Sequence, residues 1–146
     1  PAPARPLLDE MLTLVDYLTP NAGEAALLSG QPVDGPESAR AAAVRLLARG
    51  VGTVVVTLGS AGALAADGTA AVHYAAFPVK AVDTTGAGDA FNAGLAVGLA
   101  AGGTLDQAMP LANAAAALAC TKTGAQDALP DRAQVEAFLR SLRPGV

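Results

Sequence analysis

Apolar residues occur along this chain in short runs that glycine, proline and polar residues separate. The run Thr53–Thr57 is β-branched throughout, which is typical of a strand buried on both faces in a parallel sheet covered by helices. Ala63–Ala66 and Thr69–Ala75 flank Asp67-Gly68, and this arrangement predicts a β-hairpin. Further short strands are predicted at Val15–Thr19 and Val79–Val82.

Segments with helical spacing alternate with these strands. Thr104 with Gln107 forms a capping box before one of them, and Gly30 is a stop signal after another. The pattern predicts an α/β layered fold and marks no repeat, linker or domain boundary. The predicted helices span Arg5–Leu14, Asn21–Leu28, a segment with Pro36 in its first turn that ends at Gly50, Asp89–Leu99, Leu105–Cys120, and a last segment capped by Asp131 with an apolar stripe at Val135, Phe138, Leu139 and Leu142.

Composition excludes several classes of protein. The 146 residues are 52% hydrophobic and 15% charged, which predicts one ordered domain of ordinary size. The net charge is −4 and the only lysines are Lys80 and Lys122, so no nucleic acid is expected as a partner, because phosphate backbones bind clustered cations. No membrane is expected either, since Gly94–Gly103 and Leu111–Cys120 reach about half of the roughly 20 residues that span a bilayer. The mean hydropathy of +0.40 is high for a small domain and predicts surfaces that pair with a second subunit or with a missing part of the same fold.

Cysteine and histidine are scarce. Cys120 stands alone, so it forms no internal disulfide, and it is interpreted as a small core residue. The single histidine, His73, lies in the predicted hairpin and is interpreted as a surface strand residue, not as a catalytic group. The N-terminus lacks the apolar core of a signal peptide, and a cytoplasmic protein is expected.

The densest chemical signal is Asp83–Asp89, with the sequence DTTGAGD, between a predicted strand and a predicted helix. Its glycine turn lets backbone N–H groups converge, and the N-terminus of the helix directs its unpaired N–H groups and the positive end of its dipole to the same place. This combination predicts an anion site, most naturally for phosphate. A carboxylate beside a phosphate makes sense as the base for an attacking hydroxyl or as the ligand of a cation.

The competing interpretation is a plain strand–turn–helix connection, in which glycine and aspartate only form the turn. Two aspartates six residues apart around a GAG turn argue against it. The chain contains neither G-x-x-x-x-G-K-[ST] nor G-x-G-x-x-G after a strand, so the sequence supports neither a P-loop NTPase nor a dinucleotide-binding fold.

Asp83–Phe91 (DTTGAGDAF) resembles the C-terminal signature of the ribokinase-type (PfkB) carbohydrate kinases. Four further segments resemble that family in order and spacing: Pro20–Glu24 its Asn-x-x-Glu motif, Thr57–Gly62 its nucleotide-binding glycine turn, Gly124–Pro130 a late loop, and Pro1–Ala4 a mid-chain segment. The resemblance covers residues 1–146 and implies a three-layer α/β/α sandwich with a Rossmann-like central sheet, present only in part. It implies the C-terminal nucleotide-binding and catalytic half of a kinase domain, without the N-terminal sugar-binding half and its lid.

The resemblance also implies roles for single residues. Asp89 matches the base that takes a proton from the sugar's primary hydroxyl, and Gly86, Ala87 and Gly88 match the anion hole for the transferred phosphoryl group. The positions that match nucleotide-lining residues are Asn21, Thr57, Leu58, Gly59, Ser60, Ala61, Gly62, Gly88 and Asn113, with Asn113 near the adenine.

Two cations are implied. Glu24 matches a residue near the nucleotide phosphates and Mg²⁺. A monovalent cation, with K⁺ favoured, is expected at Asp83, Thr85, Ala119, Lys122, Gly124 and Ala128, in part through backbone carbonyls. Ala128 stands where ribokinases often have serine, which removes one side-chain ligand.

Simpler interpretations stay open for some of these residues. Asn21 after Pro20 fits a helix N-cap, and Glu24 fits the partner of that cap. Asn113 in an alanine-rich helix is unusual for packing alone, since a buried amide needs partners, and a ligand role is favoured.

The function expected from the resemblance is phosphoryl transfer from ATP to a sugar hydroxyl, with ribose and ribose 5-phosphate favoured as substrate and product. The alternatives are a kinase for fructose, 2-keto-3-deoxygluconate or a nucleoside, and a non-catalytic nucleotide-binding fragment or one part of a split protein. The isolated chain is expected to be inactive, and a complete member of the family to form a homodimer.

Overall fold

The computed structural model describes residues 3–142, so Pro1 and Ala2 of the first matching segment lie outside the described residues. The chain forms two compact units, Pro1–Ala75 and Ala76–Val146, which we call the first and second units. No change of composition marks this division, and each unit is described by itself.

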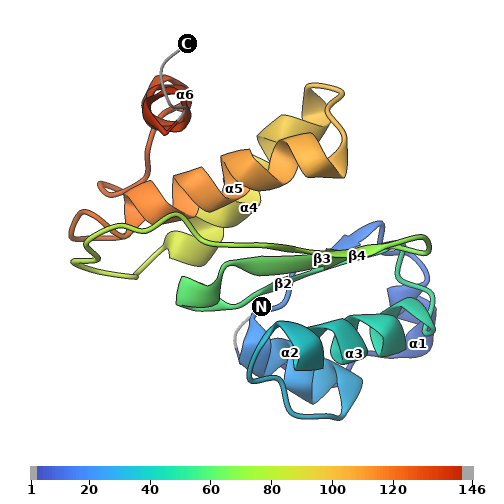
Figure 1. Ribbon diagram of the computed structural model, residues 1–146. Coiled ribbons are helices and arrows are strands. Elements are labelled where there is room, and N and C mark those ends of the chain that lie inside the picture. The colour runs from blue at the N-terminus through green and yellow to red at the C-terminus, as the bar shows by residue number, and fades with distance from the viewer. Residues whose placement is uncertain (1–2, 143–146) are drawn as a thin grey trace. The chain divides into compact units, whose positions relative to one another are not determined.

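The first unit holds a four-stranded mixed sheet in the order β1-β2-β3-β4 (Figure 1). Its strands are β1 (Tyr17–Leu18), β2 (Thr53–Thr57), β3 (Ala63–Ala66) and β4 (Ala71–Tyr74). β1 pairs parallel with β2, and the other two pairs are antiparallel. The α/β class is therefore confirmed, although the sheet is mixed and not purely parallel.

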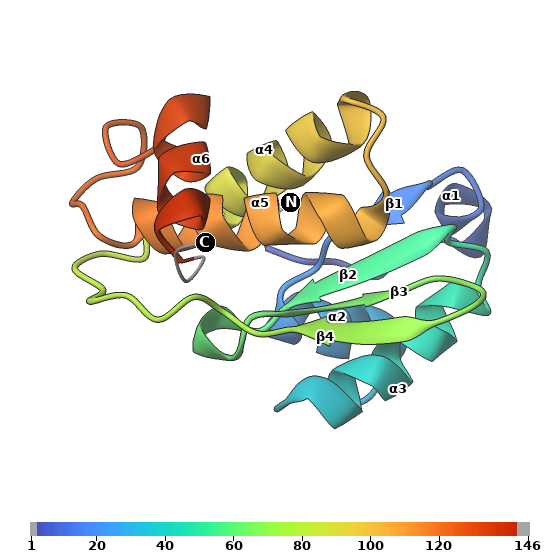
Figure 2. The same ribbon diagram turned by 45° about the horizontal axis from the view of Figure 1, so that its top comes forward.

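Helices α2 (Ala22–Ser29) and α3 (Pro36–Leu47) lie side by side along one face of this sheet, and α1 (Asp9–Leu12) is a single turn (Figures 1 and 2). A core of buried alanine, leucine and valine joins them, with Leu46, Val54 and Leu64 fully buried. Val55 is fully buried as well, and neighbours along a strand point to opposite faces. The prediction that β2 is buried on both faces is confirmed.

Two predicted elements of the first unit are shorter in the structure. The helix expected at Arg5–Leu14 is limited to α1, because Pro6 supplies no N–H and Leu8 is extended at φ −71° and ψ 145°. The strand expected at Val15–Thr19 is limited to β1, since only Tyr17 and Leu18 pair with β2.

The hairpin turn is longer than the Asp67-Gly68 pair predicts. One carboxylate oxygen of Asp67 accepts hydrogen bonds from the N–H of Thr69 at 2.7 Å and from the N–H of Ala70 at 2.9 Å. These bonds hold residues 67–70 as a turn. The Thr69 hydroxyl donates to the same oxygen at 2.7 Å and is the largest cause of the lowered pKa of Asp67, to which the two N–H bonds add. β4 therefore begins at Ala71 and not at Thr69.

The second unit contains α4 (Ala87–Ala100), α5 (Leu105–Ala119) and α6 (Arg132–Ser141). α4 and α5 pack closely because glycines of α4 face α5. A Cβ on Gly94 would lie 2.8 Å from the Ala112 Cα, and one on Gly98 would lie 2.7 Å from the Ala108 Cβ. The predicted strand Val79–Val82 is wrong: the segment pairs with no strand among the described residues, and its Val82 side chain is 62% exposed.

The predicted helix caps are confirmed. Asn21 and Glu24 form a capping box at α2, Gly30 ends that helix with φ +73°, and Asp131 caps α6. Gln107 accepts the N–H of Thr104 at 2.9 Å before α5. No helix in residues 3–142 has the length and apolar character to cross a membrane.

Candidate active site

The DTTGAGD segment forms a turn that the carboxylate of Asp83 braces. Its Oδ1 accepts the N–H of Thr85 at 2.9 Å, and its Oδ2 accepts the N–H of Gly124 at 3.0 Å. The Gly124 bond, followed by the Thr85 bonds, lowers the pKa of Asp83 from 3.8 to about 2. One ionised side chain therefore links the turn before α4 to the loop after α5.

A second link joins the same two segments through backbone. The Cys120 carbonyl accepts the N–H of Val82 at 2.8 Å and that of Asp83 at 3.3 Å. The Cys120 thiol has a raised pKa because it is partly buried and because the Asp83 charge lies near. The predicted core position of Cys120 is only partly right, since its burial is intermediate.

Gly86 caps the N-terminus of α4 in a conformation that favours glycine. Its φ is +78°, and an added Cβ would lie 3.2 Å from the Ala125 carbonyl oxygen. The Ala87 N–H bonds the Thr84 carbonyl at 3.2 Å, and the first bond of the helix runs from the Ala90 N–H to Gly86 at 2.9 Å.

The N–H groups of Gly88 and Asp89, between these bonds, donate to no carbonyl within the described chain. They are unpaired donors at the positive end of a 14-residue helix. Asp89 itself is exposed on the first turn of α4. The turn thus presents two backbone donors and one exposed carboxylate, which suits an anion and a group that accepts a proton.

The residues predicted for the monovalent cation are brought together only in part. Asp83, Thr85 and Gly124 meet in the hydrogen bonds above. Ala119 is buried at the end of α5, and its carbonyl accepts the Lys122 N–H at 3.4 Å in the same loop. Ala128 is buried and offers no side-chain oxygen.

In the first unit, the structure brings two predicted nucleotide segments together. Asn21 forms a parallel β-bridge with Thr57, whose N–H donates to Pro20 at 2.9 Å. Asn21 Oδ1 accepts the Glu24 N–H at 2.9 Å, and Glu24 Oε2 accepts the Asn21 N–H at 2.8 Å. The simpler interpretation of this pair as a helix cap is therefore correct, and it places both side chains beside the end of β2.

The turn after β2 is a single 3-10 turn, η1 (Gly59–Ala61), closed by its own backbone. The Leu58 N–H donates to the Gly62 carbonyl at 2.8 Å. In the same way the Ala61 N–H donates to the Leu58 carbonyl at 3.1 Å, and the Gly62 N–H to the Gly59 carbonyl at 3.0 Å. Gly59 and Gly62 both have positive φ, +58° and +94°. The N–H groups of Gly59 and Ser60 take no part in these bonds.

Two other residues bear on the site. Asn113 lies on α5 in the second unit and is 7% exposed, so its side chain is buried, and its ligand role stays a prediction. His73 is exposed on β4 as predicted, but its Nε2 lies 2.6 Å from the Ala61 carbonyl oxygen, a contact that the sequence did not suggest.

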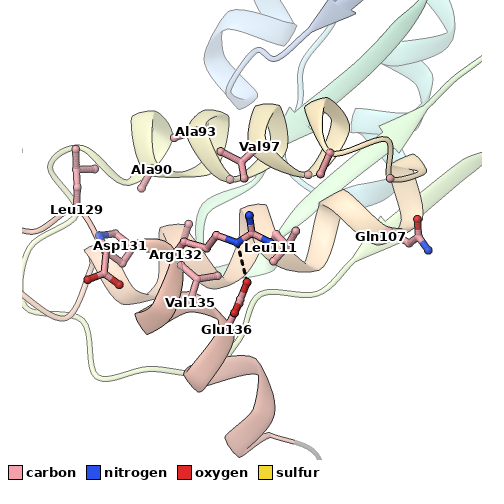
Figure 3. Close-up of a pocket in the computed structure, with 16 residues that line it drawn as sticks. Ala90, Ala93, Val97, Gln107, Leu111, Leu129, Asp131, Arg132, Val135 and Glu136 are labelled. Carbon is pink, nitrogen blue, oxygen red and sulfur yellow. Dashed lines mark hydrogen bonds and ion pairs between the residues drawn. The ribbon is translucent and has the colours of Figure 1, made fainter.

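A pocket of about 390 Å³ lies within the second unit, between α4, α5 and α6 (Figure 3). Its walls are mostly apolar, and Arg132 and Glu136 form an ion pair of 2.7 Å at its edge. None of the predicted site residues lines it. Within residues 3–142, no three His, Cys, Asp or Glu side chains are grouped as metal ligands.

Residues 1–132 match the pfkB family carbohydrate kinases. The chain is 41% identical over 139 residues to the ribokinase of Haemophilus influenzae, covering 95% of this chain and 45% of that protein. The ribokinase of Thermotoga maritima has a similar structure, with a TM-score of 0.88 and 42% identity over 96% of this chain and 47% of the other. The ribokinase of Arabidopsis thaliana also has a TM-score of 0.88, with 35% identity over 93% and 44%.

The chain thus spans about half the length of the curated relatives that it matches. These matches confirm the predicted family and a ribokinase-like α/β fold that is present in part. This chain belongs to the pfkB family of carbohydrate kinases.

Proposed function

We propose that this chain supplies the phosphoryl-transfer part of an ATP-dependent sugar kinase, with ribose as the favoured sugar. The observation that carries the proposal is the braced turn before α4, where Asp83 holds the backbone and the N–H groups of Gly88 and Asp89 stay unpaired. A phosphoryl group in transfer carries negative charge, and backbone donors fixed in advance stabilise it without reorganisation.

Asp89 is assigned as the general base. It takes the proton of the sugar's primary hydroxyl, whose oxygen attacks the γ-phosphorus of ATP while the bond to ADP breaks. Its place on the first turn of α4 supports this role, because the same turn carries the unpaired N–H groups of Gly88 and Asp89. Of the predicted anion hole Gly86, Ala87 and Gly88, the Ala87 N–H is already bonded to the Thr84 carbonyl. Base and anion hole therefore come from one rigid element.

The nucleotide is assigned to Asn21 and Thr57–Gly62 in the first unit and to Gly88 and Asn113 in the second. Related structures support ATP as the nucleotide: the Arabidopsis ribokinase was solved with ribose and ATP. A ribokinase II from Escherichia coli, 34% identical, was solved with ATP and Mg²⁺.

The donor chemistry of the assigned residues fits both cations. Glu24 uses Oε2 in the helix cap, which leaves Oε1 as a hard oxygen of the kind that Mg²⁺ takes near phosphates. Asp83 is ionised at neutral pH and stands beside a loop of backbone carbonyls, which suits a monovalent cation. The phosphofructokinase-2 of E. coli, 26% identical with a TM-score of 0.80, was solved with potassium. A bound cation would add positive charge beside the anion hole.

Ribose is favoured because the curated ribokinases of H. influenzae and Bacillus subtilis are 41% and 42% identical to this chain. A deoxyribokinase of Salmonella typhimurium at 39% identity and an aminoimidazole riboside kinase of Salmonella enterica at 34% define the neighbouring alternatives. The deoxy sugar differs from ribose by one hydroxyl, and a site that hydrogen-bonds that hydroxyl would separate them strongly.

The second candidate is a nucleotide-binding half without catalytic activity of its own. The observation that favours it is that the assigned residues serve the nucleotide and the transferred phosphoryl group, and that Asp89 is the one residue among them assigned to the sugar. On this view the chain binds ADP and acts only when a complementary half supplies the sugar contacts that position the acceptor hydroxyl.

A chimera tests the proposal and separates the candidates. This chain would replace the matching segment of the Thermotoga maritima ribokinase, which is 42% identical to it. We expect the chimera to phosphorylate ribose with MgATP, and the 146-residue chain alone to bind MgADP without kinase activity. The chimera carrying Asp89→Asn is the matched inactive control.

A folded chimera that binds MgADP but transfers no phosphate would overturn the catalytic proposal in favour of the second candidate. A panel of ribose, 2-deoxyribose, fructose, 2-keto-3-deoxygluconate and a nucleoside then ranks the substrates by kcat/KM.

A further inference from the structure

His73 is placed by the hairpin next to the glycine turn of the first unit. The β3–β4 register pairs His73 with Leu64 and Tyr74 with Ala63, the residue directly after Gly62. The imidazole Nε2 lies 2.6 Å from the Ala61 carbonyl oxygen, across 12 positions of the sequence. A carbonyl oxygen only accepts, so Nε2 carries the proton and donates.

This bond acts on one peptide unit, the one between Ala61 and Gly62. The carbonyl of that unit accepts from His73, while its N–H donates to Gly59 at 3.0 Å. The peptide is therefore held at both ends. It needs such support, because Gly62 has φ +94° and ψ −130°, and glycine residues accept φ of either sign.

The β-ladder does not account for the contact. Backbone pairing between β3 and β4 covers Ala63–Ala66 and Ala71–Tyr74, whereas Ala61 lies outside it in η1. The side chain of His73 thus reaches past the sheet to fix the turn.

We infer that His73 is a positioning residue, whose Nε2–H holds the Ala61–Gly62 peptide in the orientation that binds nucleotide. The inference rests on the proposed function, which assigns Thr57–Gly62 to the nucleotide. His73 touches no reacting atom. Its effect is to keep the Gly59 and Ser60 N–H groups, which the turn does not use, in one arrangement.

Titration of the 146-residue chain with MgADP tests this, for wild type and for His73→Ala, His73→Gln and Val72→Ala. Val72 is the matched control, because it neighbours His73 on β4, is 42% exposed and points to the other face of the strand. His73→Ala is expected to raise the Kd about three- to tenfold, the range of one net hydrogen bond. His73→Gln, which offers an N–H donor, should recover most of the affinity, and Val72→Ala should bind as wild type does.

Amide hydrogen exchange without nucleotide gives the second readout. The Ala61 and Gly62 amides should exchange faster in His73→Ala, while the β3–β4 ladder amides keep their protection. If wild type binds MgADP and His73→Ala matches it in Kd and in exchange, the role of His73 is overturned and the proposed function stands. If wild type binds no MgADP, the nucleotide assignment of the turn fails, and the role of His73 fails with it.

Discussion

The chain has two glycine turns, one at Gly59–Gly62 after β2 and one at Gly86 before α4, and they are held by different means. At Gly86 the ionised carboxylate of Asp83 bonds two N–H groups and reaches a loop 41 positions away. At Gly59–Gly62 the turn bonds to itself, and the imidazole of His73 adds one contact. The Gly86 turn depends on a charge and on a distant loop, whereas the Gly59–Gly62 turn depends on neither. The turn at Gly86 should therefore respond more strongly to mutation and to acid.

The largest effect is expected at the carboxylate that the Gly86 turn presents. In the active chimera, Asp89→Asn should lower kcat by about 10²–10⁴-fold, because a general base contributes that much, while the KM for ATP changes little. Steady-state kinetics with ribose measures it. Asp106→Asn, an exposed acid on the first turn of α5 to which no role in the site is assigned, is the control and should leave kcat unchanged. Retention of more than about a tenth of the wild-type kcat in Asp89→Asn would reject the assignment.

Removal of the Asp83 carboxylate should have the second-largest effect. Asp83→Ala frees the Thr85 and Gly124 N–H groups and lets the anion hole shift, and a misplacement of this kind costs about 10²-fold in rate. The rate of the unaltered chimera should rise with K⁺ and much less with Na⁺ at matched ionic strength, and Asp83→Ala should lose this difference. Equal rates in the two salts before mutation would count against the cation site.

A pair of glycine substitutions sharpens the comparison through stability. Gly86→Ala should destabilise the chain by about 1–2 kcal/mol, because an L residue is strained at φ +78° and its Cβ would approach the Ala125 carbonyl. Gly88 lies two residues further along, inside α4, and an added Cβ there would meet no atom within 4 Å apart from its chain neighbours and the helix's own backbone. Gly88→Ala should therefore be neutral or stabilising. Denaturant unfolding of both variants measures the difference, and equal midpoints would show that the turn tolerates a side chain.

Acid gives the smallest effect. Asp83 has a folded pKa of about 2, below its ordinary 3.8, so its contribution to stability is present above about pH 4 and is lost as the pH falls towards 2. The difference in unfolding midpoint between wild type and Asp83→Asn should thus be constant above pH 4 and shrink below it. Since Asp67 and Glu136 also have lowered pKa values, both proteins should lose stability in acid, and only their difference reports on Asp83. A difference that does not change with pH would show that the charge of Asp83 does not brace the turn.

Much of the local structure could be predicted from the sequence. The caps at Asn21, Thr104 and Asp131 and the stop at Gly30 were predictable because they involve residues within four positions of each other. The strand at Thr53–Thr57 followed from its β-branched run. The false strand at Val79–Val82 shows the limit of this reasoning, since β propensity forms no strand where no partner strand is paired with it.

The sequence by itself determined the helix caps, the hairpin and the helix N-terminus at DTTGAGD, because periodicity and turn chemistry act over a few residues. Only the tertiary structure decided that Asp83 bonds Gly124, that His73 bonds Ala61, and that Gly94 and Gly98 let α4 approach α5. Asp83 and His73 bond to backbone atoms, which every residue carries, so no side-chain pattern predicts these two partners. Gly94 and Gly98 lie against the Ala112 Cα and the Ala108 Cβ, and alanine is too common in this chain to mark a contact. Their selection depends on which loops and helices the fold brings within about 3 Å, the distance at which a hydrogen bond forms.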